Sequence, residues 1–319
     1  MVRIMKLHSQ ILKFTLVFLF FIMLISPKTV FIGASKGLLL WFQTVLPTLF
    51  PFLFITNLLL STDSISFLSS AFGTMLSRIF RVSPNGSFAV LVGFLCGYPM
   101  GAKTASDLTV SGYISQDEGR YLLSFCNNTS PMFLMNFIIW KTLKKETLFL
   151  PALLIQLLTP VIISLFTRKK YLNAKECFQN SIAKAANAPG KTKKWSFTEI
   201  DLSIMNSFET LVKVGGYIIL FSVLLALFQQ VPANFMLLKF ILPTLEITNG
   251  VVMLAETNLP FSIQFTAIMG LTAFGGVCSI AQTDCMIQKA GFPILPYIKE
   301  KLAAALTASL LTILYLHFK

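Results

Sequence analysis

The chain has 319 residues, of which 55% are hydrophobic and only 12% are charged. A soluble globular protein has about twice that share of charged residues, so this composition excludes an ordinary soluble fold. The formal net charge is +13, but no nucleic-acid-binding motif or aromatic-interleaved basic surface accompanies it, so we expect a lipid bilayer and no nucleic acid as partner.

An apolar stretch, Phe14–Ile25, follows three basic residues near the N-terminus. A signal peptide has this arrangement, but no small-residue cleavage site follows directly. Lys13 and Lys28 flank the stretch, where long basic side chains can reach the membrane surface. We therefore expect residues 1–36 to form an uncleaved N-terminal transmembrane anchor, and a cleaved signal is the alternative.

Further along, uncharged runs of about 20 residues or more recur, and twenty helical residues cross about 30 Å of hydrocarbon. The sequence therefore predicts an all-α, polytopic helical membrane protein. Pro47 and Pro51 each remove a backbone donor in the first run, which is expected either to cross with a kink or to re-enter. The runs are Gly37–Thr62, Tyr121–Trp140, Thr147–Phe166, Val214–Leu238 and Thr257–Thr283, followed by the slightly shorter Leu302–Phe318.

A basic segment divides the chain into two halves. Residues 168–194 contain eight basic residues and one acidic residue, and such an excess marks a cytoplasmic loop. We expect residues 37–145 and 204–319 to be two repeats. A connecting span and the basic cytoplasmic loop occupy residues 146–203 between them.

The two halves share a weak internal repeat. Val45–Leu59 can be aligned with Val214–Phe228, and six positions of Gly97–Tyr113 match six of Gly276–Phe292 at one constant offset. Corresponding Gly- or Pro-interrupted segments in two halves indicate the binding site of an inverted-repeat transporter. We therefore expect the interruption near Gly97 and the one near Gly276 to face each other. The two halves are expected to be related by an axis in the membrane plane.

Two motifs interrupt apolar runs with residues that lipid-facing helices avoid. They are Gly97-Tyr98-Pro99 and the polar run 127–130, which precedes Pro131. In hydrocarbon every freed backbone group needs a partner, so a broken helix survives only where it is buried in protein or lines a cavity. Carbonyl groups near Asn127 are expected to be free for a ligand or an ion. Hydrogen bonding between packed helices is the alternative role for this run. The substrate-binding residues predicted here are Asn127, Asn128, Thr129 and Ser130.

Five further residues complete the predicted substrate site: Lys103, Glu246, Asn249, Gln282 and Thr283. An intramembrane carboxylate such as Glu246 is expected to bind a proton, a cation or a solute, and an interfacial helix end is the alternative. Gln282 and Thr283 follow the interruption in the second half. Lys103 lies four residues before Asp107 on one helix face, so pairing between these two is the alternative for Lys103.

Catalytic, metal and cofactor sites are not expected. The five cysteines form no Cys-x-x-Cys motif, and the two histidines, His8 and His317, lie near the two ends of the chain. A metal centre or a histidine-based catalytic triad therefore has no suitable ligands. Paired acid–base residues are also missing, so we do not expect an enzyme.

Several motifs resemble those of one known family. Residues 93–104 (GFLCGYPMGAKT), 122–133 (LLSFCNNTSPMF), 245–250 (LEITNG) and 274–282 (FGGVCSIAQ) are similar to the sporulation integral membrane protein YlbJ family. The resemblance implies two inverted Gate-type repeats with broken or re-entrant helices, related to concentrative nucleoside transporters. It also implies a role in endospore formation, in which dipicolinic acid moves from the mother cell across the outer forespore membrane.

Dipicolinate is a flat dianion, so its binding needs donors such as amides, hydroxyls, helix N-termini and the Lys103 ammonium. Glu246 would repel it unless the carboxylate is protonated or bridged by a cation, which points to a coupling proton or cation. The alternatives are a nucleoside or other small-solute transporter and a non-transporting membrane protein of the spore envelope.

The basic segment allows a direct test of orientation. If the Lys/Arg excess sets the topology, a cysteine introduced at Asn187 in a variant without other cysteines lies on the cytoplasmic side. A membrane-impermeant thiol reagent should then label it in inverted vesicles and leave it unmodified in intact cells. Labelling from outside intact cells would contradict the orientation.

Overall fold

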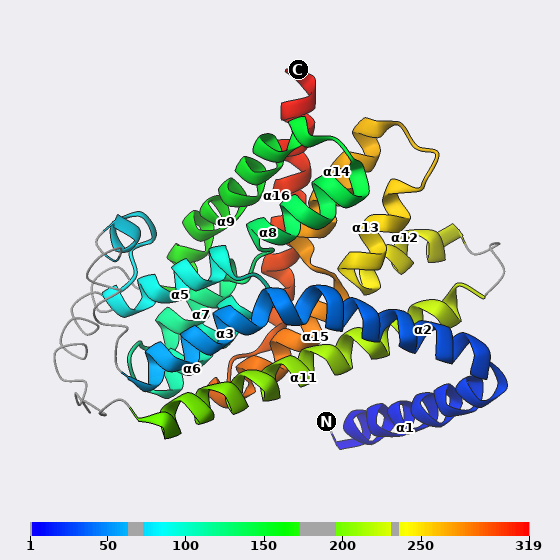
Figure 1. The fold of residues 1–319 in the computed structure, drawn as a ribbon, viewed down its shortest axis with the longest axis horizontal. Helices are drawn as coiled ribbons and strands as arrows, with labels where there is room; N and C mark the ends of the chain where they lie inside the picture. Colours follow the sequence, from blue (N-terminus) through cyan, green and yellow to red (C-terminus); the bar gives the residue numbers. More distant parts are fainter. Residues whose placement is uncertain (1, 63–72, 74, 173–195, 231–235, 319) are drawn as a thin grey trace.

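The computed structural model describes residues 2–62, 73, 75–172, 196–230 and 236–318. Every regular element in these ranges is helical (Figure 1). The α-helices before the basic segment are α1 (Val2–Ile25), α2 (Pro27–Leu40), α3 (Leu46–Ser61), α5 (Pro84–Leu95), α6 (Met100–Val110), α7 (Gln116–Cys126), α8 (Pro131–Phe133) and α9 (Phe149–Tyr171). Those after it are α11 (Phe197–Phe228), α12 (Met236–Leu245), α13 (Ile247–Ala255), α14 (Phe261–Phe274), α15 (Gly276–Ile287) and α16 (Ile294–His317). The π-helical segments are η1 (Trp41–Val45) and η2 (Leu134–Leu143), and the 3-10 turns are η3 (Glu146–Leu148) and η4 (Gln288–Ala290).

Four helical segments within the described residues are long and apolar enough to cross a membrane. Large apolar side chains such as Phe42 and Phe166 remain 61% and 75% exposed, which suits contact with lipid rather than with water. The predicted all-α, polytopic membrane protein is therefore confirmed. The four segments are Pro27–Ser61, Glu146–Tyr171, Phe197–Phe228 and Phe261–Ala290.

The first of these segments is one continuous helical rod, formed by α2, η1 and α3. It therefore does not re-enter as a hairpin. Pro47 and Pro51 both lie within this rod, and the π turn η1 directly precedes α3, which begins next to Pro47. The rod runs antiparallel along α11 (Figure 1). Trp41 Nε1 donates to the Leu211 carbonyl at 2.9 Å, and Asn57 Nδ2 donates to Ser207 Oγ at 2.9 Å.

Helices also cross two of the proposed domain boundaries. The boundary at 36/37 lies inside α2, and the boundary at 203/204 lies inside α11. Both boundaries lie where the charge or the apolarity of the sequence changes. The backbone hydrogen bonds of a helix do not depend on such a change, so each helix continues across the boundary. The boundary at 145/146 falls in a turn where Lys144 adopts a left-handed backbone with φ of 52°. Most of the basic loop, residues 173–195, lies outside the described residues.

The interruptions of the two halves contact each other, as the first part of the expectation requires, and the axis that relates the halves stays a prediction. In the first half Gly97, at φ +87°, separates α5 from α6, and in the second half Gly275, at φ +88°, separates α14 from α15. Glycine adopts this left-handed conformation without a steric penalty. Tyr98 Oη donates to the carbonyl groups of Thr272 at 3.0 Å and Ala273 at 3.2 Å. The end of α14 is thus bound to the start of α6.

Two glycines allow α5 and α6 to approach the end of α7 closely. A Cβ atom on Gly93 would lie 2.0 Å from the Cys126 carbonyl oxygen, and one on Gly101 would lie 2.2 Å from the same atom. Both contacts are with backbone, which cannot rotate away as a side chain can. The position at which α7 ends therefore depends on the absence of these two side chains.

Substitution of Gly101 by alanine tests this close packing. Because the added methyl group overlaps the Cys126 carbonyl, Gly101→Ala should lower the free energy of unfolding by about 1–3 kcal/mol. Gly216→Ala in α11 is the matched control, because its Cβ would meet nothing within 4 Å. Thermal unfolding of both purified variants in detergent measures the difference. Equal unfolding temperatures would show that the packing at Cys126 has been misassigned.

Candidate functional site

Four helix interruptions meet around one cavity, which has a volume of about 330 Å³. Gly97 contributes from the α5–α6 interruption, Ser130 from α7–α8, Glu246 from α12–α13 and Gly275 from α14–α15. This volume lies at the lower end of the range of small-molecule sites, which is roughly 300–1,000 Å³. The cavity therefore has the size of a site for one small solute.

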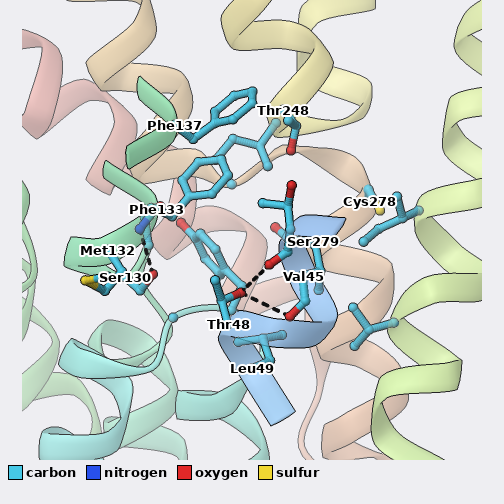
Figure 2. A pocket seen from close by; sticks show the side chains of 18 of the residues that line it. Val45, Thr48, Leu49, Ser130, Met132, Phe133, Phe137, Thr248, Cys278 and Ser279 are labelled. Carbon is cyan, nitrogen blue, oxygen red and sulfur yellow. Dashed lines mark hydrogen bonds between the residues drawn. The ribbon is translucent and has the colours of Figure 1, made fainter. Parts of the chain in front are cut away.

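The walls combine polar groups with aromatic and aliphatic surface. Figure 2 shows Thr48 of α3, Ser279 of α15 and Phe133 of α8 around the same space. The rings of Phe133 and Phe137 stack at 5.0 Å between centroids, and both line the cavity. A planar aromatic solute would find an apolar surface on these rings, with hydroxyl groups on the opposite side.

The interruption between α7 and α8 is stabilised by residues of the polar run 127–130. Ser130 Oγ accepts a hydrogen bond from the Phe133 backbone N–H at 3.1 Å and thereby caps α8. Thr129 Oγ1 donates to the Thr272 carbonyl at 2.9 Å. Thr129 therefore joins the interruption after α7 to the one after α14, and both Thr129 and Ser130 line the cavity.

Glu246 lines the cavity and caps α13. Its carboxylate accepts hydrogen bonds from the backbone N–H groups of Thr248 at 3.0 Å and Asn249 at 2.8 Å, and from Asn249 Nδ2 at 2.8 Å. The side chain is only 3% exposed. Three donors and the positive end of α13 offset its negative charge. The Asn249 amide thus binds Glu246 and does not line the cavity.

Asn127 and Thr283 lie behind the cavity wall. The Asn127 side chain is 1% exposed, and its Nδ2 donates to Thr283 Oγ1 at 2.9 Å and to Tyr297 Oη at 2.8 Å. Its side-chain oxygen accepts from the Ala102 N–H at 3.4 Å. These bonds hold α6, α15 and α16 around the end of α7.

Of the remaining predicted residues, some line the cavity and others do not. Gln282 lines the cavity, and its Nε2 lies 3.3 Å from Cys278 Sγ. Asn128 Nδ2 donates to the Phe125 carbonyl at 2.6 Å, inside its own turn, and does not line the cavity. Of the nine predicted residues, the cavity therefore gathers Thr129, Ser130, Glu246 and Gln282.

Lys103 lines a second cavity, with a volume of about 430 Å³. Its Nζ lies 2.5 Å from Asp107 Oδ2, so the alternative pairing within α6 is present. The two cavities follow each other along α11 and α15. On α11, Thr210 and Lys213 line the second cavity, and the next turn, from Val214, lines the first.

Lys301 is the residue of this region that the sequence analysis missed. Its side chain is buried, and its Nζ donates to the Asn127 carbonyl at 2.9 Å and to Tyr98 Oη at 3.1 Å. The Asn127 carbonyl, one of the carbonyl groups in this region that were expected to be free for a ligand or an ion, is therefore already bound. The available signal was the spacing of Tyr297 and Lys301, which lie four residues apart on one helix face.

The contacts predict different roles for the two neighbouring asparagines. Asn127→Ala leaves several buried groups without a partner and should lower the free energy of unfolding by about 2–4 kcal/mol. Asn128→Ala removes one local hydrogen bond and should cost about 1 kcal/mol or less. Thermal unfolding of the two purified variants compares them directly. A larger loss for Asn128→Ala would reverse the assignment.

Comparison with known proteins found similarity to a curated membrane protein. No family model matches it, and no solved structure matches it. The sporulation integral membrane protein YlbJ of Bacillus subtilis strain 168 is 24% identical to it over 338 aligned residues. The alignment covers 97% of this chain and 83% of that protein. The resemblance to the sporulation integral membrane protein YlbJ family, which the sequence motifs predict, is thereby confirmed.

Proposed function

We propose that this protein is a membrane transporter that acts in endospore formation and carries a small, planar, anionic solute. The observation that carries the proposal is the meeting of four helix interruptions around one cavity in a membrane protein. Interrupted helices at one polar site are the usual construction of a solute site in secondary transporters. A protein of the spore envelope that transports nothing would not need this construction.

Helix N-termini favour an anion in the cavity. The helices α8, α13 and α15 all begin at its wall, where their N-terminal ends carry partial positive charge. Ser130 and Glu246 cap the first two, whereas α15 begins at Gly276 without a side-chain cap. We therefore assign the carboxylate to the first turn of α15, where Cys278 lines the cavity, with the nearby charge of Glu246 neutralised by a proton or a cation. Lys141 adds a positive charge where it lines the cavity.

Dipicolinic acid is the solute that fits this combination best. Its pyridine ring matches the stacked rings of Phe133 and Phe137, and its two carboxylates match the donors just described. Family resemblance supports the same solute and movement from the mother cell across the outer forespore membrane. A nucleoside is the second candidate, because a nucleobase would use the same rings and Gln43, Asn136 and Gln282 offer amides for ribose hydroxyls.

The second cavity extends the proposed path of the solute from the first cavity toward the N-terminal end of α11. Three lysines line it, and carboxylates line it as well: Lys103, Lys213 and Lys289 with Asp107, Glu199 and Glu209. Lysines and carboxylates balance in number there, and Lys103 and Lys213 are paired with Asp107 and Glu209, so the space is polar and suited to water and a hydrated solute without a net charge of its own. Transport is thus proposed to follow the interface of α11 and α15.

Uptake into proteoliposomes tests the proposal. Vesicles that contain the purified protein should accumulate radiolabelled dipicolinate faster than protein-free vesicles, and unlabelled dipicolinate should compete better than uridine. Preference for uridine would select the nucleoside candidate. Transport of neither solute would contradict both.

The same assay examines the coupling role of Glu246. Because a coupling proton or cation would act on its charge, Glu246→Gln should lose concentrative uptake while retaining exchange across the membrane. Glu256→Gln is the matched control, since Glu256 is exposed and does not line the cavity. Wild-type concentrative uptake by Glu246→Gln would leave Glu246 with its capping role alone.

A further inference from the structure

Lys301 places a buried ammonium group between helix interruptions. Its side chain is 3% exposed, although it lies on α16, which continues without a break past the ends of α7 and α14. The Nζ atom lies 2.9 Å from the carbonyl oxygen of Asn127, 3.1 Å from Tyr98 Oη and 4.9 Å from the centroid of the Tyr98 ring. All of these contacts are with neutral groups.

No carboxylate within the described residues pairs with this ammonium. The adjacent Glu300 is already bound, because its Oε1 accepts from Lys170 Nζ at 2.9 Å and from Tyr171 Oη at 2.7 Å. A buried charge normally needs an opposite charge or a full set of dipoles. A buried lysine without them loses its proton more easily, so the tests below are made under mildly acidic conditions, where the ammonium is the form present. Here only a carbonyl, a hydroxyl and an aromatic face compensate Lys301.

These partners are the ones that a soluble monovalent cation would use. The Asn127 carbonyl follows the last turn of α7, where the helix carries partial negative charge. Tyr98 Oη donates its proton to the Thr272 and Ala273 carbonyls at the end of α14, so its oxygen is left to accept from Lys301. Unwound carbonyls and helix C-terminal ends commonly coordinate the coupling ion in transporters with broken helices.

We propose that Lys301 is a built-in cation, whose ammonium occupies the position at which the Asn127 carbonyl would otherwise bind a soluble monovalent cation. The wild-type protein therefore needs no such ion there, and removal of the ammonium opens a site for one. The prediction for stability is independent of the proposed function. The prediction that solute uptake does not depend on sodium rests on the proposed transport function.

Chemical replacement of the side chain tests this proposal. Lys301→Ala removes three carbon atoms and the ammonium nitrogen, which together correspond to n-propylammonium. The purified variant should unfold at least about 5 °C below wild type in choline chloride. Addition of n-propylammonium or sodium chloride should recover at least half of this loss. Choline, which has no N–H donor, is the reference salt, and wild type should unfold at the same temperature in all three salts.

Two further variants separate the charge from general damage. Lys299→Ala removes an exposed lysine from the same helix and should respond to none of the salts. Lys301→Met retains all but the last atom of the side-chain length without its charge and should be as unstable as Lys301→Ala. Wild-type stability of Lys301→Met would overturn the proposal. It would also be overturned if neither n-propylammonium nor sodium recovered Lys301→Ala, whether that variant is folded or fails to fold in choline.

Uptake by the wild-type protein provides the separate test of the transport consequence. Replacement of external sodium by choline should leave the initial rate of dipicolinate uptake unchanged within about twofold. Because a coupling cation at Glu246 would by itself impose a sodium requirement, the result that contradicts the built-in cation is a sodium requirement that persists in the exchange carried out by Glu246→Gln. A protein that moves no solute but shows the predicted salt response of Lys301→Ala would contradict the proposed function and leave the assignment of Lys301 standing.

Discussion

The structure depends on one constraint: each backbone group released by a broken helix in a membrane needs a partner inside the protein. Side chains next to the interruptions and side chains from distant parts of the sequence both meet this need. Ser130 and Glu246 cap the helices that start at the cavity. Tyr98 and Thr129 donate to carbonyls at the end of α14, and Lys301 donates to the carbonyl that follows α7. The cavity exists because these partners hold the interruptions in place and leave space between them.

Several features of this arrangement can be predicted from local sequence. Glycine, proline and side-chain amides in apolar runs mark where helices stop, and the left-handed conformations of Gly97 and Gly275 occur at two such positions. The constant offset between the halves also predicts that these interruptions correspond, and they contact each other through Tyr98. Such features need only the residue type and its immediate neighbours.

The direction of each side chain at the interruptions could not be predicted in the same way. Asn127 and Ser130 belong to one short polar run, yet Asn127 points into the protein toward Thr283 and Tyr297, and Ser130 lines the cavity. Thr283 and Tyr297 lie more than 150 residues from Asn127 in sequence. Local periodicity carries no information about contacts at that separation.

Lys301 shows the same difficulty in a charged residue. It follows Lys299 and Glu300, and such a charged cluster is typical of the membrane surface, directly before the uncharged run Leu302–Phe318. In the folded chain Lys299 is exposed and Glu300 binds Lys170, while Lys301 is buried in the protein interior. Three adjacent charges therefore have three different environments, which depend on how α16 packs against its neighbours, among them α14, α9 and α7.

The most direct test of the central claim is whether a solute occupies the cavity between the interruptions. A single cysteine placed at Thr48, an exposed residue that lines the cavity, reports on this when the native cysteines are replaced by serine. Dipicolinate should slow its modification by a thiol reagent at least about tenfold, and should leave a cysteine at Thr147, outside the cavity, unaffected. An unchanged rate at position 48 in saturating dipicolinate, in a protein that transports it, would contradict the account.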